Sequence, residues 1–196
     1  MATDAILGID PGLAACGWAI VSGERLLASG VVRTRPTDGS ETDRQAMICA
    51  AVMQALRECP EAVTLAGVET QHAQGGDLKT QRARAAAAMA VAFVRGGLTG
   101  ELRARGVPVV EVSPQEGKRA LTGRGDATKE QMVAMAEARF GARLAEHAAD
   151  ACGVALAAAQ VLAGRQTRGQ KRGVRREALA GLPERVREAV EKAEVR

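Results

Sequence analysis

Aromatic residues are scarce in this chain of 196 residues, which contains one Trp, two Phe and no Tyr. Its core must therefore be built mainly from Ala, Val, Leu and Met. The aromatic platforms on which many proteins stack single-stranded nucleic acid are not expected. The length is sufficient to bury a core, and one domain with an extension is the natural expectation.

Cysteine and histidine are also few. The four cysteines, Cys16, Cys49, Cys59 and Cys152, show no CxxC spacing, and the chain has two histidines. This pattern argues against a zinc site and against a disulfide framework. We therefore predict reduced, buried thiols in a cytoplasmic protein.

Segments typical of export or membrane insertion are not evident in the sequence. No basic stretch followed by an apolar stretch opens the chain, so a signal peptide is not expected. The Ala-rich stretches are short and interrupted, and we predict that none of them spans a membrane.

Positive charge is concentrated towards the C-terminus. Residues 165–196 contain ten Lys or Arg and five Asp or Glu, whereas the first 164 residues contain 17 basic and 18 acidic ones. Such a segment is either a solvated tail or an arm that binds nucleic acid or another polyanion. We predict a domain over residues 1–164 and a basic extension over residues 165–196.

The order of apolar runs and turn residues predicts an α/β chain. Strands are expected over residues 5–10, 16–22, 26–33, 63–69 and 107–112. Helices are expected over residues 42–59, over residues 78–105 with a break at Gly96-Gly97, and over residues 147–162. Two further helices should begin after the N-cap residues Ser113 and Thr128, and the second of these should end near residue 140. Gly173, Gly181 and Pro183 should leave only short helices in the tail. The short Gly23-Glu24 turn and the later β-α-β crossovers together imply a mixed sheet with helices on its faces.

Two of the predicted strands end in an acid. Asp10 closes the apolar run that begins at Ala5, and Glu69 closes the run VTLAGVE. A carboxylate at the tip of a buried strand is costly unless a cation or another partner compensates its charge. Asp10 could instead cap the Pro11-Gly12 turn, and Glu69 could be a solvated strand end.

The segment HAADA supplies two further polar groups. His147 and Asp150 are three residues apart, so they share one face of the predicted last helix. Three carboxylates and a histidine suit hard divalent cations, and two Mg²⁺ ions could drive phosphodiester hydrolysis. The alternative is an ordinary acidic first turn of a helix.

Four segments follow one another as they do in a known family. They are GIDPGxxxxGW at residues 8–18, GVE at 67–69, VSPQEGKRALTGRGDATKEQM at 112–132 and HAADA at 147–151. The chain resembles the RuvC family of Holliday-junction resolvases from about Ile6 to Gln160. The resemblance implies an RNase H-like fold with strand order 3-2-1-4-5. It also implies an endonuclease that resolves four-way DNA junctions by paired symmetric nicks in recombination and repair.

The resemblance also implies roles for individual residues. Asp10, Glu69, His147 and Asp150 match the family's metal ligands, which would hold two Mg²⁺ ions, with Mn²⁺ as a substitute. His147 stands where many members have a third Asp and some have His. Lys118 and Lys129 match two lysines near the scissile phosphate, and the resemblance implies a catalytic role for Lys118.

Shape recognition of branched DNA depends on contacts between phosphates and Lys or Arg. The further candidates are Lys79, Arg82, Arg84, Arg119 and Arg124, each of which could also belong to a solvated surface. His72 lies where well-known members carry an aromatic residue that inserts at the junction. A loop histidine in solvent is the alternative.

A four-way junction has two-fold symmetry, so we expect a homodimer. The Ala-rich stretch Ala85–Val94 is the candidate dimer helix, although it could equally be a core helix. Branch-migration helicases could act with the enzyme.

Two alternative functions are a phosphate-handling enzyme of the sugar-kinase or actin type and a protein that binds branched DNA without cutting it. Sugar kinases and actin-like proteins also begin with a strand, Asp and Gly, but they need two such lobes, and this chain has no second Asp-Gly strand tip. A catalytically weak or inactive protein that binds branched DNA is the other alternative, and the intact acids argue against it.

Overall fold

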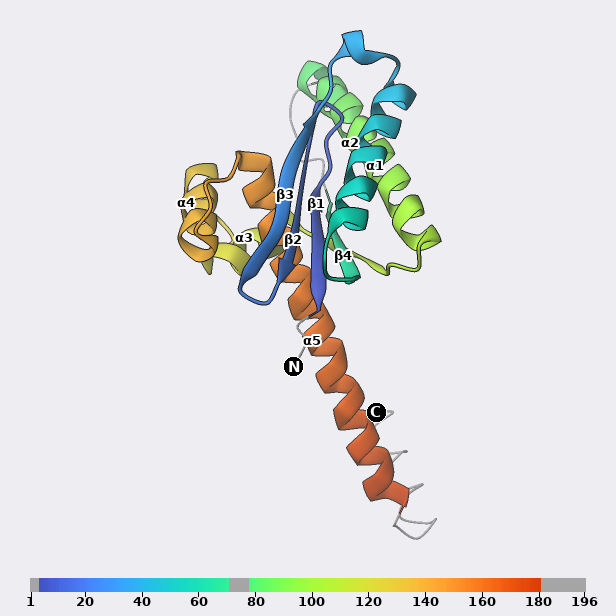
Figure 1. Ribbon diagram of the computed structural model, residues 1–196, viewed down its shortest axis with the longest axis vertical. Coiled ribbons are helices and arrows are strands. Elements are labelled where there is room, and N and C mark those ends of the chain that lie inside the picture. Colours follow the sequence, from blue (N-terminus) through green and yellow to red (C-terminus); the bar gives the residue numbers. More distant parts are fainter. Residues whose placement is uncertain (1–3, 71–77, 181–196) are drawn as a thin grey trace. The chain divides into compact units, whose positions relative to one another are not determined.

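Five strands form one mixed sheet in the order β3-β2-β1-β4-β5, and Figure 1 labels β1 to β4. The computed structural model describes residues 4–70 and 78–180, except the side chains of residues 78–84 and 165–180. The chain divides into two units, Met1–Ala159 and Gln160–Arg196, and the sheet belongs to the first. The strands are β1 (Ala5–Asp10), β2 (Ala15–Ser22), β3 (Arg25–Arg33), β4 (Val63–Glu69) and β5 (Val109–Val112). The predicted fold class and strand order are confirmed.

The first three strands form the predicted antiparallel meander. β2 pairs with both β1 and β3, and the tight turn between β2 and β3 contains Gly23 with a φ of 60°. A positive φ is easily adopted by glycine, which explains the residue at this turn. β4 runs parallel to β1, and β5 runs parallel to β4, as crossover connections through helices require.

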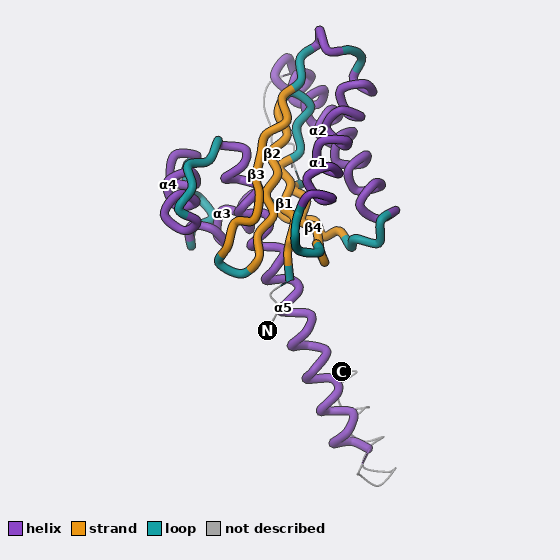
Figure 2. Tube along the Cα trace, viewed as in Figure 1, coloured by secondary structure: helices purple, strands orange, loops and turns teal. Residues whose placement is uncertain are grey.

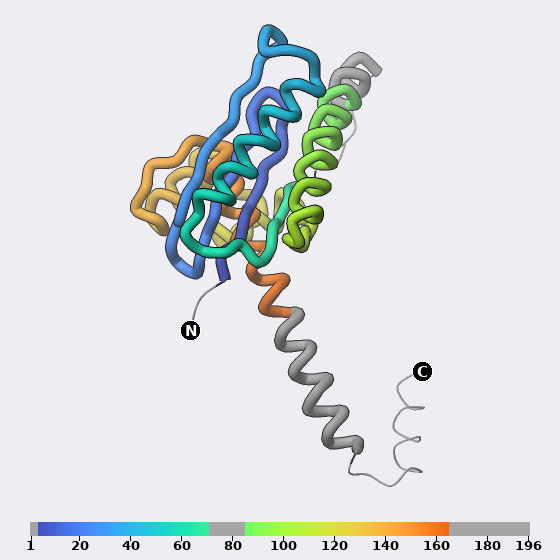
Figure 3. The backbone as a smooth tube through the Cα atoms, turned by 45° about the vertical axis from the view of Figure 1, so that its right-hand side comes forward, coloured from blue at the N-terminus to red at the C-terminus, as the bar shows by residue number. Residues whose placement is uncertain are grey.

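Two helices that run in the same direction, α1 (Glu41–Glu58) and α2 (Leu78–Ala104), cover one face of the sheet; they lie side by side in Figures 1 and 3. Alternate residues of each strand point towards these helices. The resulting core is aliphatic, as the scarcity of aromatic residues predicted. Its members include Leu7, Ile9, Ile20, Ala66 and Val68 from the sheet and Ile48, Val52, Val94, Leu98 and Leu102 from the helices.

The start of α5 (Glu146–Ala180) lies directly against the opposite face of the sheet. A Cβ atom built on Gly8 of β1 would lie 2.0 Å from the carbonyl oxygen of Ala151. One built on Gly17 of β2 would lie 2.0 Å from the carbonyl oxygen of His147. Because glycine has no Cβ, the helix backbone can approach the strands more closely than any side chain would allow.

The two short helices α3 (Pro114–Thr122) and α4 (Lys129–Phe140) pack on each other, and Figure 2 shows the loop that joins them. Both begin with the predicted capping boxes. The Ser113 hydroxyl accepts from the Glu116 N–H at 3.3 Å, and the Glu116 carboxylate accepts from the Ser113 N–H at 2.8 Å. Thr128 and Gln131 repeat the arrangement at 3.3 and 2.9 Å. Such boxes satisfy N–H groups that have no partner within the helix.

The predicted break at Gly96-Gly97 is wrong, because α2 continues through both residues. A Cβ on Gly97 would lie 2.5 Å from Nε2 of Gln45 on α1. Gly97 therefore permits the close approach of two helices instead of ending one.

The predicted end of the last helix near residue 162 is also wrong. α5 continues to Ala180 and includes Gly169 and Gly173. A glycine within a helix costs only about 1 kcal/mol relative to alanine, and the Arg, Gln and Lys residues around it favour helix. Residues 181–196, which include Gly181 and Pro183, lie outside the described part of the chain.

The Ala-rich stretches are longer and less interrupted than the sequence analysis held them to be. By length and composition, Ala85–Ala104 and Glu146–Gly164 could each cross a membrane. More than half of the second stretch is buried within the protein, which is also typical of a core helix in a soluble protein.

All four cysteines are free thiols. Cys16 and Cys152 are buried as predicted, and burial raises the pKa of each thiol to about 12. Cys49 and Cys59 are only partly buried. A thiol with such a raised pKa is a poor nucleophile, so the two buried residues contribute packing.

Candidate active site

The two central parallel strands each carry a glycine and, two residues later, an acid. In β1 these residues are Gly8 and Asp10, and in β4 they are Gly67 and Glu69. Gly8 is the register partner of Gly67. Because side chains alternate along a strand, each acid lies on the same face as its glycine, which is the face that α5 covers. The register therefore brings Asp10 and Glu69 to neighbouring positions at one end of the sheet.

The first turn of α5 brings a histidine to this place. The main chain of His147 lies against Gly17, the β2 residue that pairs with Asp10. Nδ1 of His147 and Oδ2 of Asp10 share a hydrogen bond of 2.6 Å. Asp150, one helical turn further on, is partly buried. The predicted contact between the first strand and the HAADA helix is thus present in the structure.

The three carboxylates are placed unfavourably for ionised groups. Burial and the negative charges of Asp10 and Asp150 raise the pKa of Glu69 to about 8. Burial, Asp10 and Glu146 raise the pKa of Asp150 to about 6. Burial also raises the pKa of Asp10, although its hydrogen bond to His147 acts in the opposite direction. Perturbed carboxylates that act on one another in this way are typical of functional sites.

The donor set fits a divalent cation. Carboxylate oxygens are the preferred ligands of Mg²⁺, and a cation would relieve the mutual repulsion that raises these pKa values. Within residues 4–70 and 78–180, no three Asp, Glu, His or Cys side chains are close enough to enclose one ion. For a cation to bind here, Asp10 and His147 would have to break their hydrogen bond and turn their side chains towards the ion.

Lys118 and Lys129 both act electrostatically on the acids. Lys118 of α3 lowers the pKa of Glu69, opposing the larger effect of burial. Lys129, at the start of α4, lowers the pKa values of Asp10 and Asp150. The two lysines predicted to contact phosphate thus belong to the same electrostatic cluster as the acids.

Glu146 is a member of this cluster that the sequence reasoning missed. Its carboxylate forms an ion pair with Nζ of Lys129, and this contact raises the pKa of the lysine. Its charge also raises the pKa of Asp10 and of Asp150. The available signal was its position, immediately before His147 in the first turn of α5.

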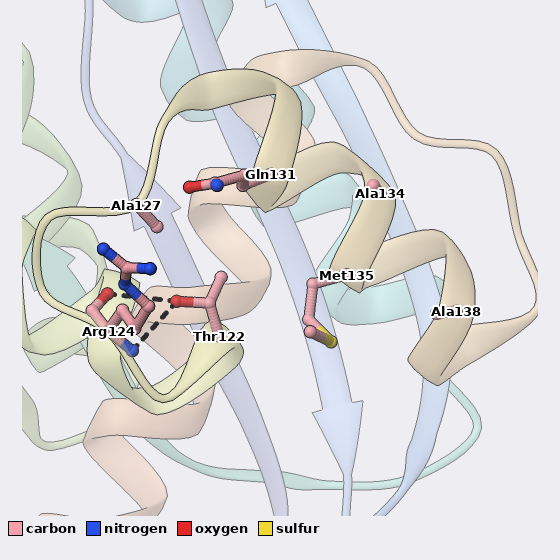
Figure 4. A pocket seen from close by; sticks show the side chains of 7 residues that line it. All are labelled: Thr122, Arg124, Ala127, Gln131, Ala134, Met135 and Ala138. Atoms are coloured by element: carbon pink, nitrogen blue, oxygen red, sulfur yellow. Dashed lines mark hydrogen bonds between the residues drawn. The ribbon is translucent and has the colours of Figure 1, made fainter.

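Of the predicted DNA-binding arginines, Arg119 is exposed and Arg124 is already paired. The Arg124 guanidinium donates to both carboxylate oxygens of Asp126, at 3.1 and 3.0 Å. Figure 4 shows the hydrogen bonds between the Thr122 hydroxyl and the main chain of Arg124. Both residues line a pocket of about 310 Å³. His72 lies outside the described residues, as do the side chains of Lys79, Arg82 and Arg84.

A sequence model of the crossover junction endodeoxyribonuclease RuvC family matches residues 6–158. The chain belongs to the RuvC family. The matched range contains all of the sheet except Ala5, the first residue of β1, and all four proposed metal ligands. RuvC from Hyphomonas neptunium is 34% identical over 171 residues, which cover 84% of this chain and 95% of that protein.

Solved RuvC structures agree with this assignment. A structure of Thermus thermophilus RuvC matches with a TM-score of 0.65 and 30% identity, covering 82% of this chain and 96% of that one. T. thermophilus RuvC in complex with a Holliday junction substrate matches with a TM-score of 0.66 and 28% identity, covering 79% and 92%. This chain and T. thermophilus RuvC thus share one fold.

The raised pKa of Glu69 predicts that the RuvC-family chain without metal loses stability as pH rises. With a pKa of about 8, Glu69 keeps its proton in the folded protein up to that pH, whereas in the unfolded chain it loses the proton near its ordinary pKa of 4.5. The free energy of unfolding should therefore fall between those values. Mg²⁺ should restore stability, and more strongly at pH 8 than at pH 6. Urea unfolding at several pH values, with Mg²⁺ or EDTA, measures both effects.

The matched variant is Glu69→Gln, which cannot ionise. It should flatten the pH dependence of stability and weaken the stabilisation by Mg²⁺. A wild-type stability that is independent of both pH and Mg²⁺ would contradict the described environment of Glu69.

Proposed function

We propose that this chain is a structure-selective endonuclease that resolves four-way DNA junctions through metal-dependent phosphodiester hydrolysis. The observation that carries the proposal is the juxtaposition of Asp10 and Glu69, at neighbouring strand ends, with His147 and Asp150 on α5. Membership of the RuvC family supports the choice of substrate, because a T. thermophilus relative has a structure with a Holliday junction. A role in DNA recombination and repair follows.

The proposed metal is Mg²⁺, held as two ions by Asp10, Glu69, His147 and Asp150. When bound, such ions activate a water molecule and stabilise the leaving oxygen. Asp10 has Glu69 of β4 on one side and His147 of α5 on the other, so it is the natural ligand for both ions to share. Mn²⁺ should substitute, because it accepts the same oxygen ligands and tolerates imidazole.

Lys118 and Lys129 are proposed to bind the phosphate under attack. An ammonium group can neutralise the charge that develops on phosphate oxygens during hydrolysis. Lys129 would exchange Glu146 for the DNA backbone, a small cost because the ion pair is exposed to solvent. Contacts between DNA and His72, Lys79, Arg82, Arg84, Arg119, Arg124 or the basic residues 165–196 remain predictions.

We also propose that the protein acts as a homodimer through α2. The outward face of this helix carries Met89, with 74% of its surface exposed, and Phe93, with 39% exposed. Ala85 and Ala92 lie on the same exposed side. A two-fold dimer built on this apolar face would present two active sites to a two-fold junction and would explain paired nicks.

Met89→Glu should therefore convert the dimer to a monomer and abolish paired nicking. A charge buried at the centre of an apolar interface is costly, so the dimer dissociation constant should rise at least tenfold. Analytical ultracentrifugation measures this directly. Met135→Glu is the control, because Met135 is 41% exposed on α4, away from the proposed interface. Dimers of equal strength in Met89→Glu and wild type would place the interface elsewhere.

Cleavage of a synthetic four-way junction tests the proposed activity. With Mg²⁺ the wild type should nick two opposed strands symmetrically, with EDTA it should bind without nicking, and a linear duplex should remain intact. The alternative of an inactive junction-binding protein is not favoured, because the acids of the site are all present. Tight junction binding without cleavage in Mg²⁺ or Mn²⁺ would nevertheless establish it and overturn the proposal.

A further inference from the structure

Arg44 is a charged residue in the interior of the first unit. It lies on α1, one turn before the core residue Ile48, and only 9% of its surface is exposed. Among the residues that the structure describes, no carboxylate forms an ion pair with it. Burial of an unpaired guanidinium is costly, so its hydrogen bonds must account for its place.

Those hydrogen bonds go to Thr34, which follows β3, and to the Leu13 carbonyl, which follows the Asp10 strand β1. Nε of Arg44 donates to the Thr34 hydroxyl at 2.9 Å, and Nη2 donates to the carbonyl oxygen of Leu13 at 3.4 Å. The Thr34 hydroxyl in turn donates to the same Leu13 oxygen, and the Thr34 N–H donates to the carbonyl of Ala14 at 3.1 Å. Thr34 itself is 4% exposed. One side chain on α1 thus joins the end of β3 to the turn after β1.

The turn that these hydrogen bonds hold begins at Asp10, whose carboxylate belongs to the proposed metal site. Two residues, Pro11 and Gly12, separate Asp10 from Leu13. Pro11 has a fixed φ, and a Cβ on Gly12 would lie 2.4 Å from the carbonyl oxygen of Ala15. A turn this short, held at its far end by these hydrogen bonds, constrains the position of Asp10 at its near end.

We propose that Arg44, acting through Thr34 and the Leu13 carbonyl, is a positioning residue for Asp10 in metal binding. The inference rests on the proposed metal site and adds to it an outer residue that never touches the ion or the DNA. Groups that orient metal ligands from outside typically change metal affinity or activity by about 10- to 100-fold when they are removed. The proposal therefore predicts a defect in metal binding that is separate from DNA binding.

The test compares four variants by Mn²⁺ titration calorimetry without DNA, together with junction cleavage at increasing Mn²⁺ concentration. Arg44→Met should weaken Mn²⁺ binding about tenfold or more, leave the junction Kd unchanged, and regain most of its kcat at high Mn²⁺. Thr34→Val should show the same pattern, whereas Thr34→Ser, which keeps the hydroxyl, should resemble the wild type. Arg57→Met, at an exposed position on the same helix, is the control for loss of an arginine.

The outcomes separate this inference from the proposed function. If folded Arg44→Met and Thr34→Val bind Mn²⁺ as the wild type does, the positioning role is wrong although the metal site stands. If the wild type itself binds no Mn²⁺, the proposed metal site fails first. Should Arg44→Met not fold, the Thr34→Val and Thr34→Ser pair decides, because both retain the arginine. Equal Mn²⁺ affinity in that pair would overturn the inference.

Discussion

Replacement of Asp10 with Asn should reduce junction cleavage by about 10³-fold or more, the loss expected when a group that stabilises the transition state is removed. Asn keeps the size of the side chain but removes the charge that is proposed to hold both ions. Binding of the junction should change by less than about threefold, because affinity for DNA comes mainly from Lys and Arg contacts to phosphate. Gel shift in EDTA and single-turnover cleavage in Mg²⁺ measure the two quantities separately.

Asp4→Asn is the matched control, since Asp4 is exposed immediately before β1, at the end of the strand opposite Asp10. Its cleavage rate should equal that of the wild type. If Asp10→Asn cleaved at a normal rate, the assignment of Asp10 as a metal ligand would be wrong, whatever the other acids do.

Gly8→Ala should be among the most destabilising single-methyl changes in the protein. The added Cβ would lie 2.0 Å from the carbonyl oxygen of Ala151 and 2.5 Å from the backbone nitrogen of Ala155. Both are main-chain atoms of α5, so the helix must move away from the central strand. Overpacking of this kind should lower the free energy of unfolding by about 3 kcal/mol. Because the same helix carries His147 and Asp150, Mn²⁺ binding should weaken as well.

Gly100→Ala is the control for Gly8→Ala. Gly100 lies on the exposed side of α2, and a Cβ built there meets nothing within 4 Å. Alanine should raise helix propensity at this position by up to about 1 kcal/mol. Urea unfolding of both variants tests the packing argument, and equal stability of Gly8→Ala and wild type would show that α5 does not depend on this contact.

The strands and the acids could be predicted from the sequence because both depend on local patterns. Apolar runs that end in Asp10 and Glu69 marked the strands, and Gly23 marked the turn between β2 and β3. The spacing of three between His147 and Asp150 placed both on one helix face, and His147 indeed meets Asp10. The repeated Gly-x-acid pattern of β1 and β4 also explains, in hindsight, which face these acids share.

The errors and omissions concern contacts between segments far apart in the chain. Gly97 resembled a helix break, but its role is to admit Gln45 of α1, 52 positions earlier in the sequence. Glu146 meets Lys129 across two helices, and Arg44 reaches Thr34 and Leu13 from α1. No local pattern distinguishes such residues from ordinary surface charges, because their environment is created only by the packing of the sheet.

The position of bound Mn²⁺ in a crystal of the wild-type protein tests the central claim most directly. We predict anomalous density for Mn²⁺ within coordination distance of carboxylate oxygens of Asp10 and Glu69, with His147 turned from its hydrogen bond with Asp10 towards the ion. The claim would be contradicted if Mn²⁺ bound elsewhere while Asp10 and His147 kept their hydrogen bond.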